Sequence, residues 1–159
     1  MAPGRIRNGT GYMMKHAVTF SFVFLLMLII LSSPAFPQVQ TRLRIIQASN
    51  VGSTIDPSLK DLRDQLAPSF NFTSYRLLRD ERLSLSPNKP AEISAHPNIA
   101  LEITLVKQRK NNAEFRVRIR REGTEILNTQ VRLSPGRTVL IGGPKHGEGI
   151  AILAITARF

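Results

Sequence analysis

The segment from Ile99 to Leu133, IALEITLVKQRKNNAEFRVRIRREGTEILNTQVRL, decides the fold of this chain. Three stretches within it alternate apolar with polar residues, which is typical of strands with one buried face. The residues of the apolar face all fall at odd positions: Leu101, Ile103, Leu105, Phe115, Val117, Ile119, Leu127, Thr129, Val131 and Leu133. The segment therefore predicts three consecutive antiparallel strands that form a meander.

The odd positions also constrain the turns of this meander. Facing residues share the buried face only if their numbers sum to an even value. This condition excludes a two-residue turn in either connection. It predicts a three-residue loop at Arg121, Glu122 and Gly123, with Gly123 in the left-handed conformation, and another loop of odd length around Asn111 and Asn112.

A strand and a helix are expected before the meander. Residues 41–48, TRLRIIQA, alternate as a strand does. A helix should follow, because Asp56 can cap the exposed first-turn amides and Pro57 suits the first helical position. Its apolar face carries Leu59, Leu62 and Leu66, and Pro68 is expected to stop it.

The rest of the chain reads as strands and turns. We expect short strands at residues 74–78 and 83–85, and a loop or edge segment around Pro87, Pro90 and Pro97. The last two strands are expected at residues 138–141 and 150–157. The final segment, IAILAITA, is apolar on both faces and predicts a central buried strand.

The N-terminal part of the sequence predicts export. Residues 17–31, AVTFSFVFLLMLIIL, form an apolar run after a basic stretch without acidic residues. Small residues at Ser33 and Ala35 suit signal peptidase, so residues 1–35 are expected to be a signal peptide cleaved after Ala35. An uncleaved anchor is the alternative, although a spanning helix needs about 20 apolar residues. Met14 is a possible true start.

The mature part, residues 36–159, is then a single α+β domain: an antiparallel β-meander or sandwich with one short helix after the first strand. It carries 19 of the 22 basic residues and all 11 acidic ones, so its net charge is +8. The chain has no cysteine. This excludes disulfides, thiolate nucleophiles, cysteine-ligated metals and a lipidated cysteine.

A basic stripe on the outward face of the meander is the first candidate site. Its residues are Lys107, Arg116, Arg118, Arg120 and Arg132. Such a stripe could bind an anionic envelope component or an acidic protein. The alternative is a solvated face on which arginines pair with Glu102 or Glu114. Nucleic acid is not expected, because export removes that partner and few aromatic residues interleave with the stripe.

A glycine-rich segment near the C-terminus, GGPKHGEG, is the second candidate. Gly142, Gly143, Gly147 and Gly149 are expected to form a structural loop between the last two strands, within which Lys145 and His146 could hold an anion. The segment lacks the Gly-Lys-Ser/Thr ending of a phosphate loop and precedes a strand instead of a helix. A plain strand connection is the alternative.

The sequence indicates no catalytic set, metal or cofactor. His96 and His146 do not have zinc-site spacing, and no Gly-x-Ser-x-Gly motif is present. A small hydrolase or ligand-binding protein that uses these histidines and the glycine-rich loop is the alternative function.

Several motifs resemble a known group of proteins. The segments RIIQASN, DPSLKDL, SYRLL, VRLSPGRTVLIGGPKHGEG and IAILAI are similar to small exported proteins of Gram-negative bacteria that have no assigned activity. The opening strand, helix and strand look more loosely like the periplasmic ring-building modules of secretins. The resemblance implies a role in the envelope. We therefore expect a non-enzymatic periplasmic or envelope-associated module whose partner is another envelope protein or an anionic component, with membrane contact only through an uncleaved leader.

Overall fold

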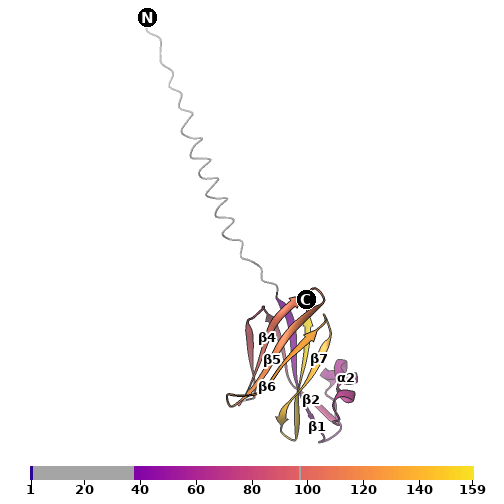
Figure 1. Cartoon of the computed structure of the whole chain (residues 1–159). Coiled ribbons are helices and arrows are strands. Elements are labelled where there is room, and N and C mark those ends of the chain that lie inside the picture. The colour runs from indigo at the N-terminus through magenta and orange to yellow at the C-terminus, as the bar shows by residue number, and fades with distance from the viewer. Residues whose placement is uncertain (2–37, 97) are drawn as a thin grey trace. The chain divides into compact units, whose positions relative to one another are not determined.

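In the part of the chain that the structure describes, eight strands form two antiparallel sheets of four strands each (Figure 1). The computed structural model describes residue 1 and residues 38–96 and 98–159. The predicted signal peptide, its cleavage site and the possible start at Met14 lie outside the described residues. Residues Pro37–Phe159 form one compact unit.

The first sheet, here called sheet A, joins the two ends of the domain. Its order is β2-β1-β8-β7, so the first and last strands are the central pair. The bounds are β1 Val39–Ser49, β2 Ser74–Leu85, β7 Thr138–His146 and β8 Gly149–Arg158. The predicted buried final strand is confirmed, because β8 is buried along nearly its whole length.

The second sheet, sheet B, has the order β3-β4-β5-β6, in which β4, β5 and β6 are the predicted meander and β3 comes from the segment expected as a loop or edge. The bounds are β3 Pro90–His96, β4 Ile99–Arg109, β5 Asn112–Arg121 and β6 Thr124–Leu133. Strand β3 lies at the edge and begins with Pro90, a position where the missing amide costs little. The expected short strands at residues 74–78 and 83–85 are instead one continuous strand, β2.

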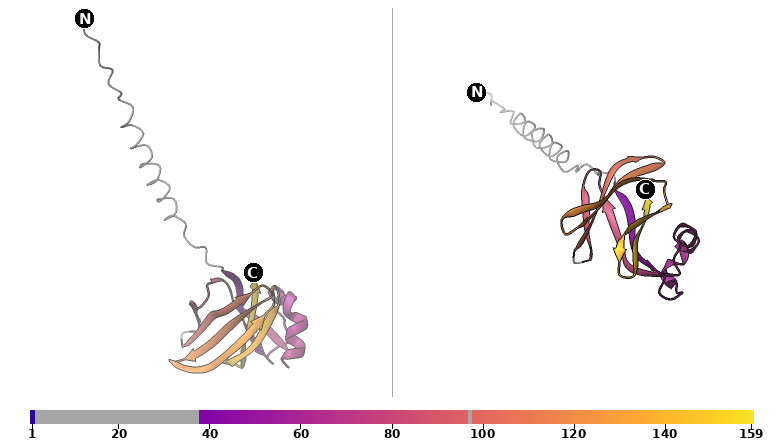
Figure 2. Two further views of the ribbon diagram at one scale, coloured as in Figure 1. Left: turned by 45° about the horizontal axis from the view of Figure 1, so that its top comes forward. Right: turned by 60° about the horizontal axis from the view of Figure 1, so that its bottom comes forward.

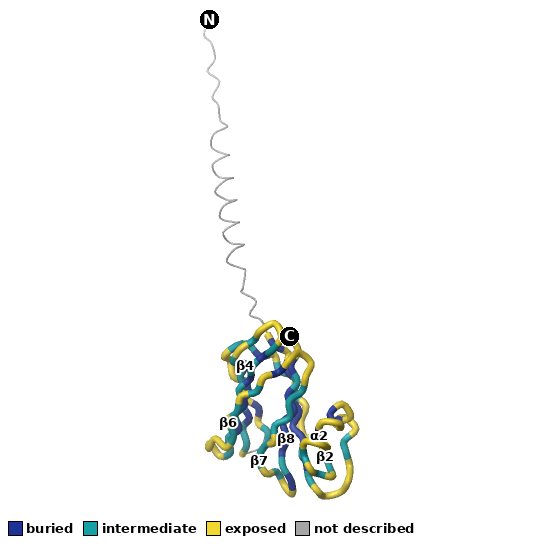
Figure 3. Tube along the Cα trace, turned by 45° about the vertical axis from the view of Figure 1, so that its right-hand side comes forward, coloured by how far each residue is buried: buried dark blue, intermediate teal, exposed yellow. Residues whose placement is uncertain are grey.

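Apolar side chains from both sheets fill the space between them. This core includes Leu43, Ile103, Phe115, Val117 and Ile155, all of them 0% exposed. Figure 3 shows the buried positions running along the strands where the sheets face each other. The sandwich thus rests on the alternation that the sequence displays.

A second, smaller core lies on the other face of sheet A. A 3-10 helix, η1 (Pro57–Leu62), continues into α2 (Arg63–Ser69), and Figure 2 shows this helical segment beside sheet A, away from sheet B. Leu59, Leu62 and Leu66 pack against Ile46 and Ile152. Asp56 caps the segment by accepting hydrogen bonds from the Ser58 amide at 2.9 Å and hydroxyl at 2.6 Å. Pro68 lies inside the last turn, not after it.

The meander has the expected parity of facing positions but not the expected turns. Leu101 faces Ile119 and Val117 faces Thr129, both even sums. Yet the strands are joined by two-residue turns, at residues 110–111 and at Glu122 and Gly123. The predicted three-residue loop is wrong because β-bulges at Val106 and Ile126 insert the extra residue inside the strands. Gly123 has the predicted left-handed φ, +80°, and Glu122 shares it at +51°.

The glycine-rich segment is not a loop. Residues 142–146 belong to β7 and Gly149 opens β8, so only Gly147 and Glu148 form the turn. Close packing explains the glycines: a Cβ on Gly149 would lie 1.8 Å from the Ala48 carbonyl oxygen, and one on Gly143 would lie 2.8 Å from that of Ala151. Glycine at these two positions therefore lets the neighbouring strands approach closely enough to pair.

Candidate anion-binding site

The predicted basic stripe lies on the outer face of sheet B, where carboxylates interleave with it. Arg118 contacts Glu102 at 2.8 Å and Arg120 contacts the same carboxylate at 3.5 Å. Arg132 contacts Glu114 at 2.7 Å, and Lys107 lies directly opposite Glu114 in the β4–β5 pair. Three of the five basic residues are therefore in ion pairs.

Two further carboxylates reduce the charge of this face. Glu92 is paired with Glu102, and Glu125 with Arg120, so both point to the same side as the stripe. Arg116 lies between Thr104 and Gln130. With Arg109, which lies on the same face as Lys107, six basic residues thus meet four acidic ones, which leaves this surface an excess of two positive charges for recognising an anion.

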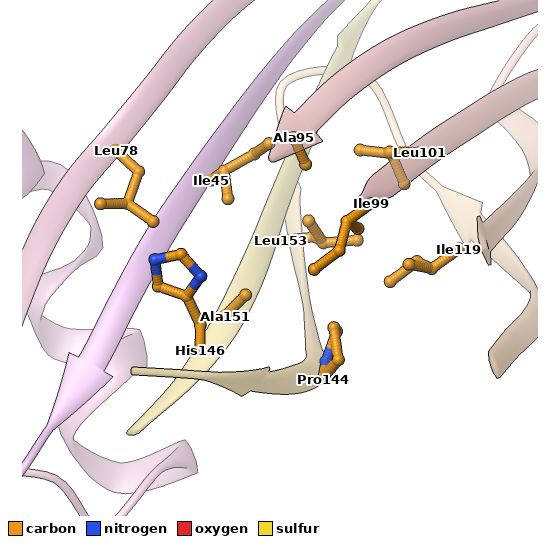
Figure 4. A pocket seen from close by; sticks show the side chains of 10 residues that line it. All are labelled: Ile45, Leu78, Ala95, Ile99, Leu101, Ile119, Pro144, His146, Ala151 and Leu153. Carbon is orange, nitrogen blue, oxygen red and sulfur yellow. The ribbon is translucent and has the colours of Figure 1, made fainter. Parts of the chain in front are cut away.

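The other predicted candidates are distributed along β7. Lys145 is exposed, and its backbone carbonyl accepts a hydrogen bond from Arg121 at 3.2 Å. His146 and Pro144 line a small cavity between the sheets together with apolar residues such as Leu78 and Leu153 (Figure 4). The cavity offers about 20 Å³, room for about one water molecule, whereas small-molecule sites usually exceed about 300 Å³. His96 is the last residue of β3.

A larger concavity lies on the outer face of sheet A, beside the helical segment. Even-numbered residues of β1 point to this face, and η1 and α2 cover Ile46 and Ala48 but leave Gln40 and Arg42 open to the concavity, which Arg44 lines from a buried position. Its volume is about 490 Å³. The residues that line this arginine pocket are Gln40, Thr41, Arg42, Arg44, Asp61, Gln65, Arg82, Gly136, Arg137, Thr138, Thr156 and Arg158.

The strand register gathers arginines that are distant in the sequence. In the β1–β2 pair Arg42 faces Arg82, and in the β1–β8 pair Gln40 faces Arg158. Like charges directly opposite each other destabilise a sheet. The Arg42–Arg82 pair is therefore unfavourable in itself, and the hydrogen bonds of Arg42 to Asp80 offset part of the repulsion.

A tight turn adds the fifth arginine to the rim. In the sequence SPGR, residues 134–137, the Arg137 amide donates to the Ser134 carbonyl at 3.1 Å and Gly136 has φ +74°. Proline followed by a glycine with positive φ is typical of a type II turn. The Gly136 amide also donates to the Ala157 carbonyl at 2.8 Å, which anchors the turn to β8.

Arg44 forms the floor of the pocket and is 1% exposed. Its two terminal nitrogens donate to the two carboxylate oxygens of Asp61, both at 2.8 Å. Hydrogen bonding from Arg44 lowers the pKa of Asp61, whose side chain is 57% exposed. The Nε of Arg44 is buried and has no acceptor among the described residues.

The remaining charges of the pocket are not balanced. Arg42 donates from Nε to Asp80 at 2.8 Å, and this hydrogen bonding lowers the pKa of Asp80. Arg82, Arg137 and Arg158 are exposed and form no ion pair with another described residue. Five arginines thus meet two aspartates, a local excess of three positive charges that suits an anion.

Sequence reasoning missed this pocket because its arginines meet only through long-range pairing of β1 with both β2 and β8. The alternation of Arg42 and Arg44 with Leu43 and Ile45 was visible, and SPGR was a readable turn signal. Neither indicates which strands become neighbours. The meander, by contrast, places its charges on consecutive strands and was therefore easier to read.

Comparisons of the chain with protein-family models, with curated proteins and with solved structures find no match. Within residues 38–96 and 98–159, no three His, Asp or Glu side chains gather as a metal site would require. No helix in the part of the chain that the structure describes is long and apolar enough to cross a membrane.

Proposed function

We propose that this protein is an exported, non-enzymatic interaction module that binds an anionic group of another envelope component through the arginine pocket. The observation that carries the proposal is the uncompensated cluster of Arg82, Arg137 and Arg158 around a concavity of about 490 Å³. Export is supported by the basic and then apolar N-terminal sequence, and envelope location follows from export.

Shape and charge favour the arginine pocket over the stripe of sheet B. The pocket is concave, and its exposed arginines have no carboxylate partner among the described residues, whereas Glu102 and Glu114 already pair with the stripe. Charges that are free before binding can neutralise a ligand without first breaking an ion pair. The stripe remains a second candidate surface, and it can be tested in the same experiment.

Three triple variants that each remove three positive charges separate these surfaces. The pocket variant is R82A/R137A/R158A, and the meander variant is R116A/R118A/R120A. The control variant, K89A/R109A/K110A, removes three exposed charges on the sheet B side that form no ion pair with a described residue. Equal charge loss means that any difference between the variants reports the site, not the net charge.

The experiment is capture of the full-length protein from gently crosslinked cells, with washes at low and high salt. An antibody should replace a C-terminal tag, because Arg158 is the penultimate residue and lines the pocket. We expect a stoichiometric envelope component with the unchanged protein and with the control variant, and its loss with the pocket variant. Loss with the meander variant alone would overturn the assignment to the pocket. The N-terminus of the recovered chain, read by mass spectrometry, tests cleavage after Ala35.

A further inference from the structure

We infer that the ligand of the arginine pocket is a multiply charged phosphate group, a phosphate monoester or a diphosphate, and that Asp61 is a built-in counter-ion with which this ligand competes for Arg44. The inference rests on the proposed function and deepens it by naming the chemical class of the ligand. Three observations support it: the excess of positive charge in the pocket, the geometry of the arginine–aspartate pairs, and the burial of Arg44.

Asp61 and Asp80 show how the arginines of this pocket bind a carboxylate group. Asp61 takes both terminal nitrogens of Arg44, and Asp80 takes two nitrogens of Arg42 at 2.8 and 2.5 Å. In both pairs a single guanidinium takes both carboxylate oxygens. A carboxylate ligand held in the same way would engage one of the three exposed arginines and leave two uncompensated.

A phosphate group fits the remaining charge better. A phosphate monoester carries about −1.5 to −2 charges at neutral pH and offers three strong acceptor oxygens, and a diphosphate carries more of both. Arg82, Arg137 and Arg158 supply three planar forks from three different segments, two strands and a turn. The hydroxyls of Thr138 and Thr156, which lie 2.6 Å apart on the floor, add neutral hydrogen-bonding groups.

Arg44 is the residue for which the ligand and Asp61 compete. Its guanidinium is almost fully buried, and its Nε has no acceptor among residues 38–96 and 98–159, so these residues do not saturate its donors. Asp61 approaches it from η1 with a side chain that is 57% exposed and therefore free to move toward water. An anion at the floor competes with this carboxylate, so neutralising Asp61 without changing its shape should strengthen anion binding.

Isothermal titration of the protein, recovered from cells that produce the full chain, with pyrophosphate and inorganic phosphate tests the inference. Succinate and acetate serve as the carboxylate comparison. We expect one pyrophosphate per chain, binding at least about tenfold weaker in the pocket variant, which corresponds to about 1.4 kcal/mol. The control variant should bind as the unchanged protein does, and Asp61→Asn should bind several-fold more tightly. Single variants Arg82→Ala and Arg158→Ala change exposed residues and report on the site should Asp61→Asn fail to fold.

Succinate binding as tightly as pyrophosphate, or no pyrophosphate binding at all, would overturn the inference. If pyrophosphate does not bind while the envelope component is still captured through the pocket arginines, the ligand class is wrong and the proposed function stands. If capture is independent of the pocket arginines, the proposed function fails as well.

Vesicles identify the source of the phosphate. Association with vesicles that contain phosphatidic acid, but not with pure phosphatidylcholine, and its competition by pyrophosphate assign a lipid headgroup. Binding of free pyrophosphate without vesicle association assigns a soluble or protein-borne phosphate. Both results support the inference.

Discussion

Replacing the two partners of the Arg44–Asp61 ion pair one at a time should give unequal effects on stability. Arg44 is 1% exposed, whereas the side chain of Asp61 is 57% exposed. Removing Asp61 leaves a buried guanidinium without its counter-ion, while removing Arg44 leaves a carboxylate that water can solvate. Comparing the two single variants therefore tests whether Arg44 is retained for stability or for binding.

The structure sets the magnitudes. Removing one partner of a fully buried pair costs about 3–5 kcal/mol. Water can enter beside the exposed Asp61, so we reduce this to about 2–3 kcal/mol for Asp61→Ala, or roughly 8–12 °C in Tm for a domain of this size. Arg44→Met removes the cost of burying the charge and its unpaired Nε, and methionine fills an irregular space well, so its free energy of unfolding should be unchanged or raised by about 1 kcal/mol.

Urea unfolding followed by circular dichroism is the suitable assay, because the chain has no tryptophan. The double variant R44M/D61A should resemble Arg44→Met, since the buried charge is gone in both. The reasoning is refuted if Arg44→Met lowers the free energy of unfolding as much as Asp61→Ala does. That result would mean that the ion pair holds the helical segment in place and that Arg44 is a structural residue.

Three other perturbations test the rest of the structure. Gly149→Ala should prevent stable folding, because the new Cβ would lie 1.8 Å from the Ala48 carbonyl oxygen between the two central strands. Recovery of soluble folded protein checks this prediction. Gly136→Ala is a milder control, because its Cβ would have no other atom within 4 Å. Phe115→Ala should lower the free energy of unfolding by about 3–5 kcal/mol in a urea titration, since Phe115 is 0% exposed in the core between the sheets. Hydrogen bonding from Arg44 and Arg42 lowers the pKa values of Asp61 and Asp80 below the ordinary value of an aspartate, so the folded state binds fewer protons in acid. Their stabilisation is present above about pH 4 and is lost as pH falls through the folded pKa values. Unfolding midpoints between about pH 6 and pH 2 should show a shallower acid loss for Asp61→Asn than for the unchanged protein, and an identical loss would contradict the assignment.

The sequence predicts the sandwich because local alternation determines it. Leu101, Phe115 and Leu127 belong to three strands whose apolar faces must meet, and that requirement gives the parity of the facing positions without any knowledge of the turns. The turns were mispredicted because a bulge at Val106 or Ile126 satisfies the same parity condition inside the strand. Parity alone does not distinguish a longer turn from a bulge.

The site was harder to predict because the residues of the neighbouring strands decide whether a charged side chain on a strand is paired or free. The sequence left open whether Arg118 and Arg120 are free or pair with Glu102, and β4 brings that carboxylate beside them. Arg82 and Arg158 looked unremarkable, but β1 brings both to the face that carries Arg42. Which residues neutralise a charge depends on long-range strand order, and the local pattern does not contain that order.

Site-specific photocrosslinking in cells tests the central claim most directly. A photoreactive phenylalanine is placed at Gln65, on the rim of the arginine pocket, or at Asn128, an exposed residue on the outer face of sheet B. We predict an adduct with an envelope component from Gln65 that disappears in the R82A/R137A/R158A background, and no such adduct from Asn128. An adduct from Asn128 alone, or one from Gln65 that survives loss of the three arginines, would contradict the account.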